Sequence, residues 1–115
     1  MELREIIELL DCDILNTSFE LNRNYEKAFG SDLMSDVLAF IHDETTVLIT
    51  GLVNQQVIRT AEMIDLKLIV FVRGKVPADE VVELADNQGI TLLSTKASMF
   101  DAAGILFEKG LRGID

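Results

Sequence analysis

Hydrophobic and polar positions alternate along the chain in patterns that predict helices and strands in turn. The first ten residues predict an amphipathic helix, because apolar side chains recur there at helical spacing, at Leu3, Ile6, Ile7 and Leu10. The stretch DILN, which begins at Asp13, is a candidate for a short strand. Residues 16–27 are polar without a sustained period, so they predict a loop that leads into a strand near residues 25–29.

A second helix is predicted after Gly30, where apolar residues return to helical spacing at Leu33, Val37, Leu38 and Ile41. Two Ser-Asp pairs, Ser31-Asp32 and Ser35-Asp36, lie at its start. A serine there can cap the free amides of the first turn, and an aspartate complements the positive end of the helix dipole. We expect one pair to act in this way. The alternative for Ser31 and Asp32, next to a strand end, is the rim of a ligand pocket.

From residue 45 onward, three apolar and β-branched runs alternate with three helical patterns. The predicted strands are 45–51, 66–74 and 90–95, and the predicted helices lie near 54–64, from Pro77 to Gly89 and from Ser98 to Gly110. Pro77 is expected at the first helical position, with Asp79 and Glu80 in the first turn. Ser98 and Asp101 resemble a capping box.

This alternation predicts an α/β fold. We expect a single layered domain over residues 1–115, with a mainly parallel sheet flanked by helices.

The composition and the net charge of the chain indicate which kinds of partner it can bind. Hydrophobic residues make up 49% of the chain and charged residues 26%, which is typical of a globular protein. Twenty Asp and Glu against ten Lys and Arg give a net charge of −10, which disfavours nucleic acid. The apolar runs are far shorter than the roughly 20 residues of a membrane span, and the N-terminus lacks the basic region of a signal peptide. We therefore expect a cytoplasmic protein with neither a membrane nor a nucleic-acid partner.

The residues that most often carry catalysis are sparse. Cys12, the only cysteine, lies between Asp11 and Asp13, whose charges raise the pKa of a thiol and make it less nucleophilic. The only histidine, His42, stands beside two acidic residues, a pattern more typical of an exposed loop than of a metal site. The chain contains neither of the glycine-rich phosphate-binding motifs of kinases and dinucleotide-binding enzymes. We therefore predict no catalytic residue, no metal and no cofactor.

Small and cationic residues follow the three predicted strands at their carboxyl ends. In a parallel sheet these ends meet at one edge, where ligands commonly bind. Arg73, Lys75 and Lys96 would bring three cations to that edge, and the amides after the strand glycines would donate to a phosphate or carboxylate, as would the hydroxyls of Thr50, Ser94 and Thr95. The alternative is that the glycines only turn the chain and the lysines only face solvent. The predicted ligand-binding residues are Gly51, Asn54, Arg73, Gly74, Lys75, Ser94 and Thr95.

A resemblance to the DRTGG domain family is carried by two segments, AFGSDLMSDVLAF and VLITGLVNQQVIRTAEMIDLKLIVFVRGKVPADEVVELADNQGITLLSTKASMFDAAGILF. It covers about residues 13–110 and is closest to the small stand-alone members that bacteria often encode near iron-only hydrogenase genes. Larger relatives carry the domain inside phosphotransacetylases and between CBS domains in inorganic pyrophosphatases. The resemblance implies a fold similar to the N-terminal domain of HPr kinase, and a regulatory or assembly module, often dimeric, that is not an enzyme.

The motifs of that family are partly present. Gly51 and Gly74 match its glycines, and the Ser94-Thr95 pair matches its last strand. Leu52-Val53 stands where the family has Asp-Arg, and Val72-Arg73-Gly74 stands where it has Thr-Gly-Gly. The loss of the Asp-Arg pair counts against a retained anion site.

Two functions fit these residues. The first is a non-catalytic regulatory domain whose strand-end loops sense an anionic or nucleotide-like metabolite. The second is a dimeric protein-interaction module without a small ligand, which docks a redox or hydrogenase-related partner. In either case, apolar surface that few helices can cover predicts a homodimer.

Overall fold

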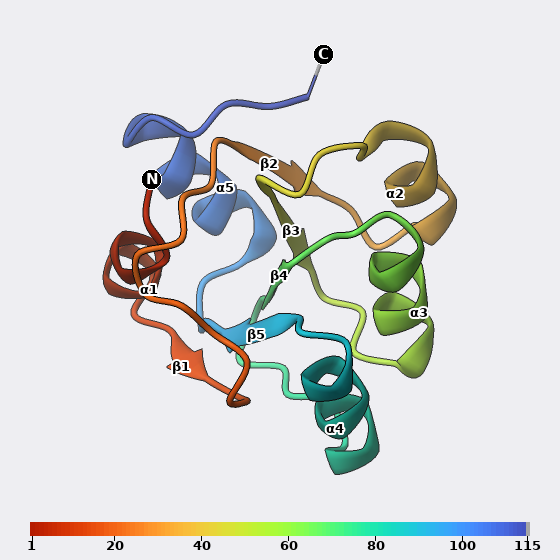
Figure 1. Ribbon diagram of the computed structural model, residues 1–115. Coiled ribbons are helices and arrows are strands. Elements are labelled where there is room, and N and C mark those ends of the chain that lie inside the picture. Colours follow the sequence, from red (N-terminus) through yellow and green to blue (C-terminus); the bar gives the residue numbers. More distant parts are fainter. Residues whose placement is uncertain (115) are drawn as a thin grey trace.

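A five-stranded sheet runs through the centre of the molecule (Figure 1). In the computed structural model, which describes residues 1–114, its strands are β1 (Asp13–Ile14), β2 (Lys27–Gly30), β3 (Thr46–Thr50), β4 (Leu68–Phe71) and β5 (Thr91–Ser94). The order across the sheet is β1-β5-β4-β3-β2. Strands β2 to β5 pair in parallel, and β1 pairs with β5 in the antiparallel direction. The mainly parallel sheet predicted from the sequence is confirmed.

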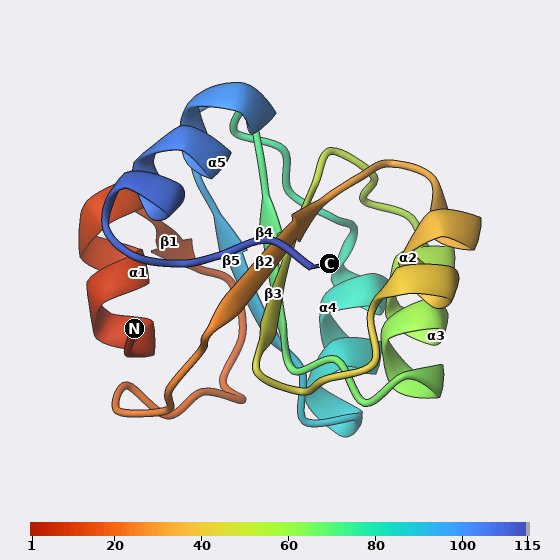
Figure 2. The same cartoon turned by 90° about the horizontal axis from the view of Figure 1, so that it is seen from above.

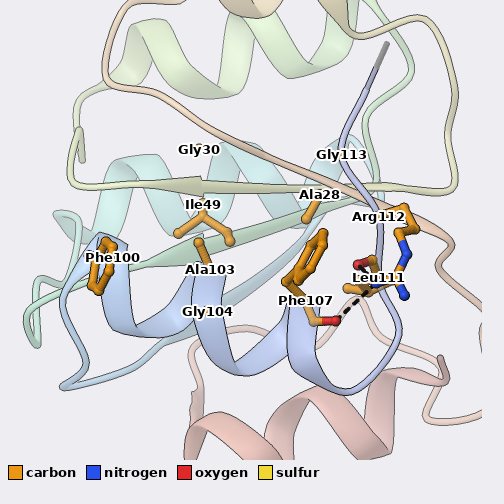
Figure 3. A pocket seen from close by; sticks show the side chains of 10 residues that line it. All are labelled: Ala28, Gly30, Ile49, Phe100, Ala103, Gly104, Phe107, Leu111, Arg112 and Gly113. Carbon is orange, nitrogen blue, oxygen red and sulfur yellow. Dashed lines mark hydrogen bonds between the residues drawn. The ribbon is translucent and has the colours of Figure 1, made fainter.

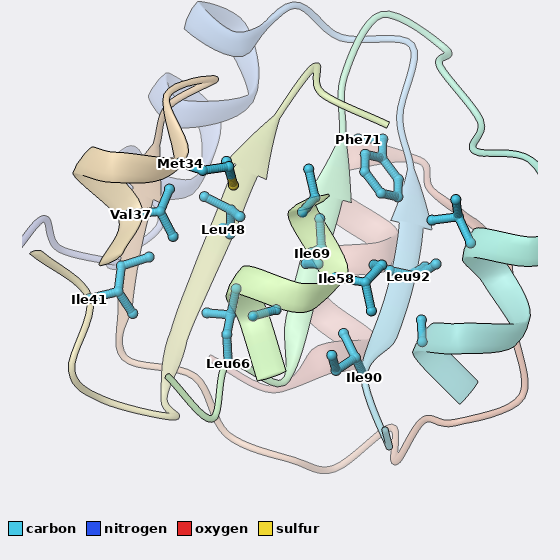
Figure 4. Packing of buried hydrophobic residues seen from close by; sticks show 14 residues of the cluster. Met34, Val37, Ile41, Leu48, Ile58, Leu66, Ile69, Phe71, Ile90 and Leu92 are labelled. Carbon is cyan, nitrogen blue, oxygen red and sulfur yellow. The ribbon is translucent and has the colours of Figure 1, made fainter. Parts of the chain in front are cut away.

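Helices cover both faces of this sheet (Figure 2). Helices α1 (Leu3–Leu10) and α5 (Met99–Glu108) lie on one face, and α2 (Met34–Phe40), α3 (Gln55–Met63) and α4 (Asp79–Asn87) lie on the other. A buried apolar cluster fills each interface. The cluster beneath α2, α3 and α4 contains Leu48, Ile69 and Phe71 (Figure 4), and the cluster beneath α1 and α5 contains Val47 and Val70. Successive strand side chains point to opposite faces, so the central strands contribute to both clusters.

The register of the sheet aligns the carboxyl ends of its central strands. Thr50 of β3 lies opposite Phe71 of β4, which lies opposite Ser94 of β5. Every residue of these three strands is buried, as expected for parallel strands that helices cover on both faces. The loops that follow the three strands therefore emerge side by side at one edge of the sheet.

Helix α4 ends before Gly89, as predicted, but its first residue differs from the prediction. Gly89 has a left-handed φ of 70° just beyond the helix, and Asp79 and Glu80 occupy its first turn as predicted. The prediction that Pro77 is the first helical residue was wrong. The N-cap is Ala78, whose extended backbone lets the buried ring of Pro77 precede the helix.

Helices α5 and α2 begin in different ways. Ser98 is the N-cap of α5, as predicted, because its side chain accepts a hydrogen bond from the Asp101 amide at 3.1 Å. In α2 the N-cap is Leu33, which has no side-chain acceptor, and Ser35 lies inside the first turn. The predicted serine cap of α2 was therefore wrong, whereas Asp36 does lie in the first turn.

The N-terminal segments largely follow their predicted positions. Helix α1 and strand β1 form where the pattern predicts them, and β2 overlaps the predicted strand. The loop between β1 and β2 is anchored by Asn16, whose buried side chain donates to the Ile90 carbonyl at 2.7 Å and accepts from the Leu92 amide at 3.0 Å. These bonds continue the pairing of β1 with β5. Within residues 1–114, no helix combines the length and apolar character needed to cross a membrane.

Candidate functional site

The carboxyl ends of β3, β4 and β5 bring most of the predicted ligand-binding residues together. Lys75, in the loop after β4, donates through Nζ to the carbonyl of Gly51, just after β3, at 3.1 Å. Ser94, at the end of β5, donates through Oγ to the carbonyl of Lys75 at 2.9 Å. Three consecutive loops are therefore tied to one another. We call this region the strand-end edge, and its residues are Asp32, Thr50, Gly51, Arg73, Gly74, Lys75 and Ser94.

Arg73 and Gly74 make a sharp turn after β4, with φ angles of 57° and 68°. Both amides hold the turn in place, since Arg73 N donates to the Ala97 carbonyl and Gly74 N to the Thr95 carbonyl, each at 2.8 Å. In this left-handed region a residue other than glycine costs about 1 kcal/mol or more. Position 73 would therefore be more relaxed with glycine, and the sequence places a charged side chain there instead.

The guanidinium of Arg73 lies over Gly51. A Cβ atom on Gly51 would stand 3.1 Å from Arg73 Nη2 and 3.6 Å from Asp32 Oδ1, so the missing side chain leaves room for both groups. Among residues 1–114, neither Arg73 nor Asp32 takes part in an ion pair closer than 4.0 Å. The charge of Arg73 is therefore exposed near Asp32 without a direct salt bridge to it.

Asp32 lies at the centre of the strand-end edge. Its Oδ1 accepts hydrogen bonds from the Gly51 amide at 2.7 Å and from the Thr50 hydroxyl at 2.9 Å. The Thr50 oxygen in turn accepts from the Leu52 amide at 3.1 Å. A carboxylate of the protein itself therefore occupies the position beside Gly51 where the sequence predicted an anionic ligand.

This environment favours the ionised form of Asp32. The hydrogen bond from the Gly51 amide lowers the pKa of Asp32 most, and partial burial opposes that effect. The Thr50 hydroxyl and the charges of Arg73 and Lys75 lower the pKa further. The carboxylate thus stays charged to a lower pH than an ordinary aspartate, and the two cations partly balance its charge.

The amides predicted to hold a phosphate are already used within the protein. Those of Gly51 and Leu52 donate to side-chain oxygens, and those of Gly74 and Lys75 donate to backbone carbonyls. The hydroxyls of the strand-end edge donate to protein oxygens as well. In this structure the predicted amides are therefore engaged within the protein, because turns satisfy their own polar groups at short range. The groups that face solvent for an anion are the Arg73 and Lys75 side chains.

The side chains of two predicted residues make none of these contacts. Asn54 is the exposed N-cap of α3, and its side chain forms no cap hydrogen bond. The hydroxyl of Thr95 turns toward α1, where it donates to the Leu10 carbonyl at 2.6 Å. Lys96, the third predicted cation, lines a hollow of about 320 Å³ together with Gly74, Ser94 and Thr95 of the predicted site, and Asp11 and Asp13 also border this hollow. All three predicted cations therefore lie in the loops that follow β4 and β5.

The Ser31-Asp32 pair belongs to the turn that follows β2. The Ser31 amide donates to the Ile49 carbonyl at 3.0 Å, which extends the pairing of β2 with β3. The Ser31 oxygen accepts from the Leu33 amide at 3.0 Å, which bends the chain toward α2. This turn carries Asp32 to Gly51. The pocket-rim alternative for this pair stays a prediction, and the signal in the sequence for the turn was the glycine that ends β2.

The remaining candidates for chemistry do not join this edge. Burial raises the pKa of Cys12 to about 12, and Asp13 and Asp11 add to the shift, so the thiol is a poor nucleophile at neutral pH. The Asp43 carboxylate beside His42 accepts from the Thr45 amide and hydroxyl, each at 2.7 Å. Across the described residues 1–114, no three His, Cys, Asp or Glu side chains lie in an arrangement that could hold a metal ion.

A solved structure shares this fold. It is the crystal structure of the CBS and DRTGG domains of the regulatory region of Clostridium perfringens pyrophosphatase, complexed with the activator diadenosine tetraphosphate. The TM-score is 0.72 at 19% sequence identity, and the match covers 91% of this chain and 45% of that chain. The chain therefore spans less than half the length of that solved protein. A search of curated protein sequences found no match.

The family comparison agrees with the fold. The model of the DRTGG domain family matches residues 5–108, which include every helix and strand described above except the first two residues of α1. The protein belongs to the DRTGG domain family.

Proposed function

We propose that this protein is a non-catalytic regulatory domain that binds an anionic, nucleotide-like metabolite. The proposed ligand-binding residues remain those predicted from the sequence, with Ser31 and Asp32 at the rim. The observation that carries the proposal is the position of two solvent-facing cations, Arg73 and Lys75, at the carboxyl ends of parallel strands in a chain of net charge −10. Open α/β sheets commonly bind ligands at this edge.

The solved relative supports the class of ligand. That protein is a regulatory region complexed with diadenosine tetraphosphate, an anionic nucleotide. An anion is recognised by cations with donors of fixed direction, and a guanidinium provides both. In this chain Arg73 is oriented by a constrained turn, and Lys75 is held near it by the Gly51 carbonyl.

Asp32 provides a physical route from binding to regulation. A phosphate drawn to Arg73 and Lys75 would compete with the Asp32 carboxylate for the same positive potential. Displacement of Asp32 would free the Gly51 amide and the Thr50 hydroxyl, which shape the start of the loop from β3 to α3. Binding would thereby change the conformation of the loop from β3 to α3, which a partner protein can recognise.

A thermal-shift series tests this function. Diadenosine tetraphosphate, ATP and inorganic phosphate are titrated separately, because a ligand that binds only the folded state raises the melting temperature with its concentration. The double variant Arg73→Ala/Lys75→Ala should lose the shift and keep its fold, since both side chains are exposed. The matched control, Lys67→Ala/Lys109→Ala, removes the same charge away from the strand-end edge and should keep the shift. An equal shift in both double variants would place binding elsewhere.

A second candidate is a dimeric protein-interaction module that docks a redox or hydrogenase-related partner. The observation that favours it is a pair of large apolar side chains on α5, Phe100 and Phe107, which are 85% and 60% exposed. Under this candidate no nucleotide changes the melting temperature, and the strand-end edge is covered in a subunit contact. A homodimer and a cytoplasmic location are compatible with both candidates and stay predictions, which sedimentation and cell fractionation test.

A further inference from the structure

Helix α5 is apolar on two opposite sides. On one side Ala102 and Leu106 are fully buried against the sheet. On the other side Phe100, Ala103, Gly104 and Phe107 recur at helical spacing, and all four are exposed. A surface helix normally has a polar outer face. A helix with two apolar faces is typical of an element that is covered on both sides.

The outer face of α5 borders a hollow of about 340 Å³ next to the edge strand β2 (Figure 3). Phe100 and Phe107 stand at the two ends of this hollow, with Ala103 between them. The lining consists of Ala28, Gly30, Ile49, Phe100, Ala103, Gly104, Phe107, Leu111, Arg112 and Gly113. We call this surface the α5 groove. Its ends are formed by the rings of Phe100 and Phe107, and its middle is lined by the small residues Ala103 and Gly104.

The α5 groove carries no acidic residue, although the chain has twenty. Its one charged side chain is Arg112, which is fixed in place. The guanidinium lies 4.6 Å from the centre of the Phe107 ring, and Nη1 donates to the Phe107 and Leu111 carbonyls at 3.0 Å each. Two copies of a chain with net charge −10 repel one another over most of their surfaces. The lining of the α5 groove is where such copies can approach closely, although the exposed Asp101 and Glu108 stand one helical turn on either side of Gly104 and border it.

The order of residues along this face is symmetric. The pattern Phe-x-x-Ala-Gly-x-x-Phe, from 100 to 107, reads in the same size order from either end. If two α5 helices cross in opposite directions between Ala103 and Gly104, Phe100 of each copy meets Phe107 of the other. A two-fold interface places the same patch of both subunits in contact, so a self-matching pattern suits it. Aromatic pairs formed in this way add to the gain from apolar burial.

We propose that the α5 groove binds a second copy of this chain through an antiparallel pair of α5 helices about a two-fold axis. The small side chains at the crossing point let the helices approach, and each aromatic ring enters the end of the facing groove. The proposal goes beyond the ligand-binding function and does not depend on it.

The apolar surface area that the interface can bury indicates how stable this dimer is. At 85% and 60% exposure, four rings supply on the order of 600 Å² of apolar surface. That area is about half of the roughly 1,200 Å² at the lower end of specific interfaces. Interfaces of this size are typically reversible, so we expect dissociation in the micromolar range rather than a permanent dimer.

Sedimentation equilibrium tests the surface. The parent protein should be a dimer at high micromolar concentration, and Phe100→Glu should weaken the dimer by about a hundredfold or more, because the change occurs twice in a symmetric interface. The control is Met63→Glu, which alters a side chain that is 73% exposed on α3, across the sheet, and should remain dimeric. A parent protein that is monomeric at every concentration, or a Phe100→Glu variant that dimerises like the parent, overturns the proposal.

Disulfide trapping tests the position of the two-fold axis. In a Cys12→Ser background, Gly104→Cys places a thiol near the axis, and an added side chain at Gly104 meets no atom within 4 Å in the monomer. Mild oxidation should convert this variant to a covalent dimer, whereas Met63→Cys in the same background should stay monomeric. Equal cross-linking of the two variants contradicts the α5 crossing. Loss of the dimer without loss of a nucleotide-dependent thermal shift, or the reverse, separates this proposal from the proposed function.

Discussion

The strand-end edge and the α5 groove differ in chemistry and in how many of their groups already contact a partner within the protein. The strand-end edge is polar, and the α5 groove is apolar. At the strand-end edge, amides, hydroxyls and a carboxylate have already found partners in one another, and only two cations face outward. In the α5 groove, the Phe100 and Phe107 rings remain exposed, although the Arg112 guanidinium lies over Phe107. Polar groups that satisfy one another are stable in water without a ligand, whereas exposed rings gain free energy only when a partner covers them.

The difference originates in how the helices are distributed over the sheet. Three helices cover one face and two cover the other, so the end of the second face beside β2 receives less cover. Strand β2 is the edge strand and is only partly buried, unlike β3, β4 and β5. The α5 groove lies beside β2, at the end of the face that only α1 and α5 cover. A ligand site and an oligomer interface can therefore occupy separate parts of the same small fold.

The largest effect is expected from replacing Asp32. Asp32→Ala removes the acceptor for the Gly51 amide and the Thr50 hydroxyl, and should cost about 1 to 2 kcal/mol of unfolding free energy. The same change should strengthen the binding of ATP, since a competing carboxylate is gone. Urea unfolding and thermal-shift titration measure the two effects.

Asp32→Asn separates the charge from the hydrogen bonds. The amide oxygen can still accept from Gly51, so most of the stability should return while the gain in ATP binding persists. If both variants bind ATP more weakly than the parent, Asp32 contributes to the ligand site and is not a competitor of the ligand.

The second effect is a dependence on pH. Because the folded-state pKa of Asp32 is lowered by the Gly51 amide, against partial burial, ionised Asp32 stabilises the fold above its unfolded pKa of about 4. That contribution is lost as the pH falls through the lower, folded-state pKa. The difference in unfolding free energy between the parent and Asp32→Asn should therefore shrink below about pH 4. A difference that is constant from neutral to acidic pH would contradict the charged role of Asp32.

The fold could be predicted from the sequence to a large extent. Strands β3, β4 and β5 are uninterrupted apolar runs, and a run buried on both faces is recognisable without any partner information. Helix starts were predicted where a side chain makes the cap, as at Ser98, and missed where packing decides. Pro77 is buried and precedes Ala78, the N-cap of α4, and the N-cap of α2 is Leu33, which makes no side-chain cap.

The candidate site was predicted in part, for a similar reason. The strand ends and their cations follow from topology, so Gly51, Arg73 and Lys75 could be placed together from the sequence. The hydrogen bond from Gly51 to Asp32 could not, because it depends on the turn that Ser31 makes after β2. The α5 groove was missed because exposed and buried apolar residues look alike in a helical pattern.

A smaller effect concerns the strained turn that carries the cation. Replacing Arg73 by glycine removes the unfavourable left-handed conformation, whereas alanine keeps it. Arg73→Gly should therefore be more stable than Arg73→Ala by about 1 kcal/mol. Both variants should lose the response to ATP, because both lack the guanidinium. Equal stability of the two variants in urea unfolding would show that the backbone relaxes at this position and holds no strain.

The smallest effect compares the two serines near α2, and the structure predicts opposite signs for them. The Ser31 oxygen accepts from the Leu33 amide, so Ser31→Ala should destabilise the protein by about 0.5 to 1 kcal/mol. Ser35 is exposed inside the first turn of α2, where alanine is the better helix former, so Ser35→Ala should stabilise by a few tenths of a kcal/mol, about 0.3. Thermal and urea unfolding of both variants resolve the signs. A loss of stability in Ser35→Ala as large as in Ser31→Ala would mean that Ser35 caps α2 after all.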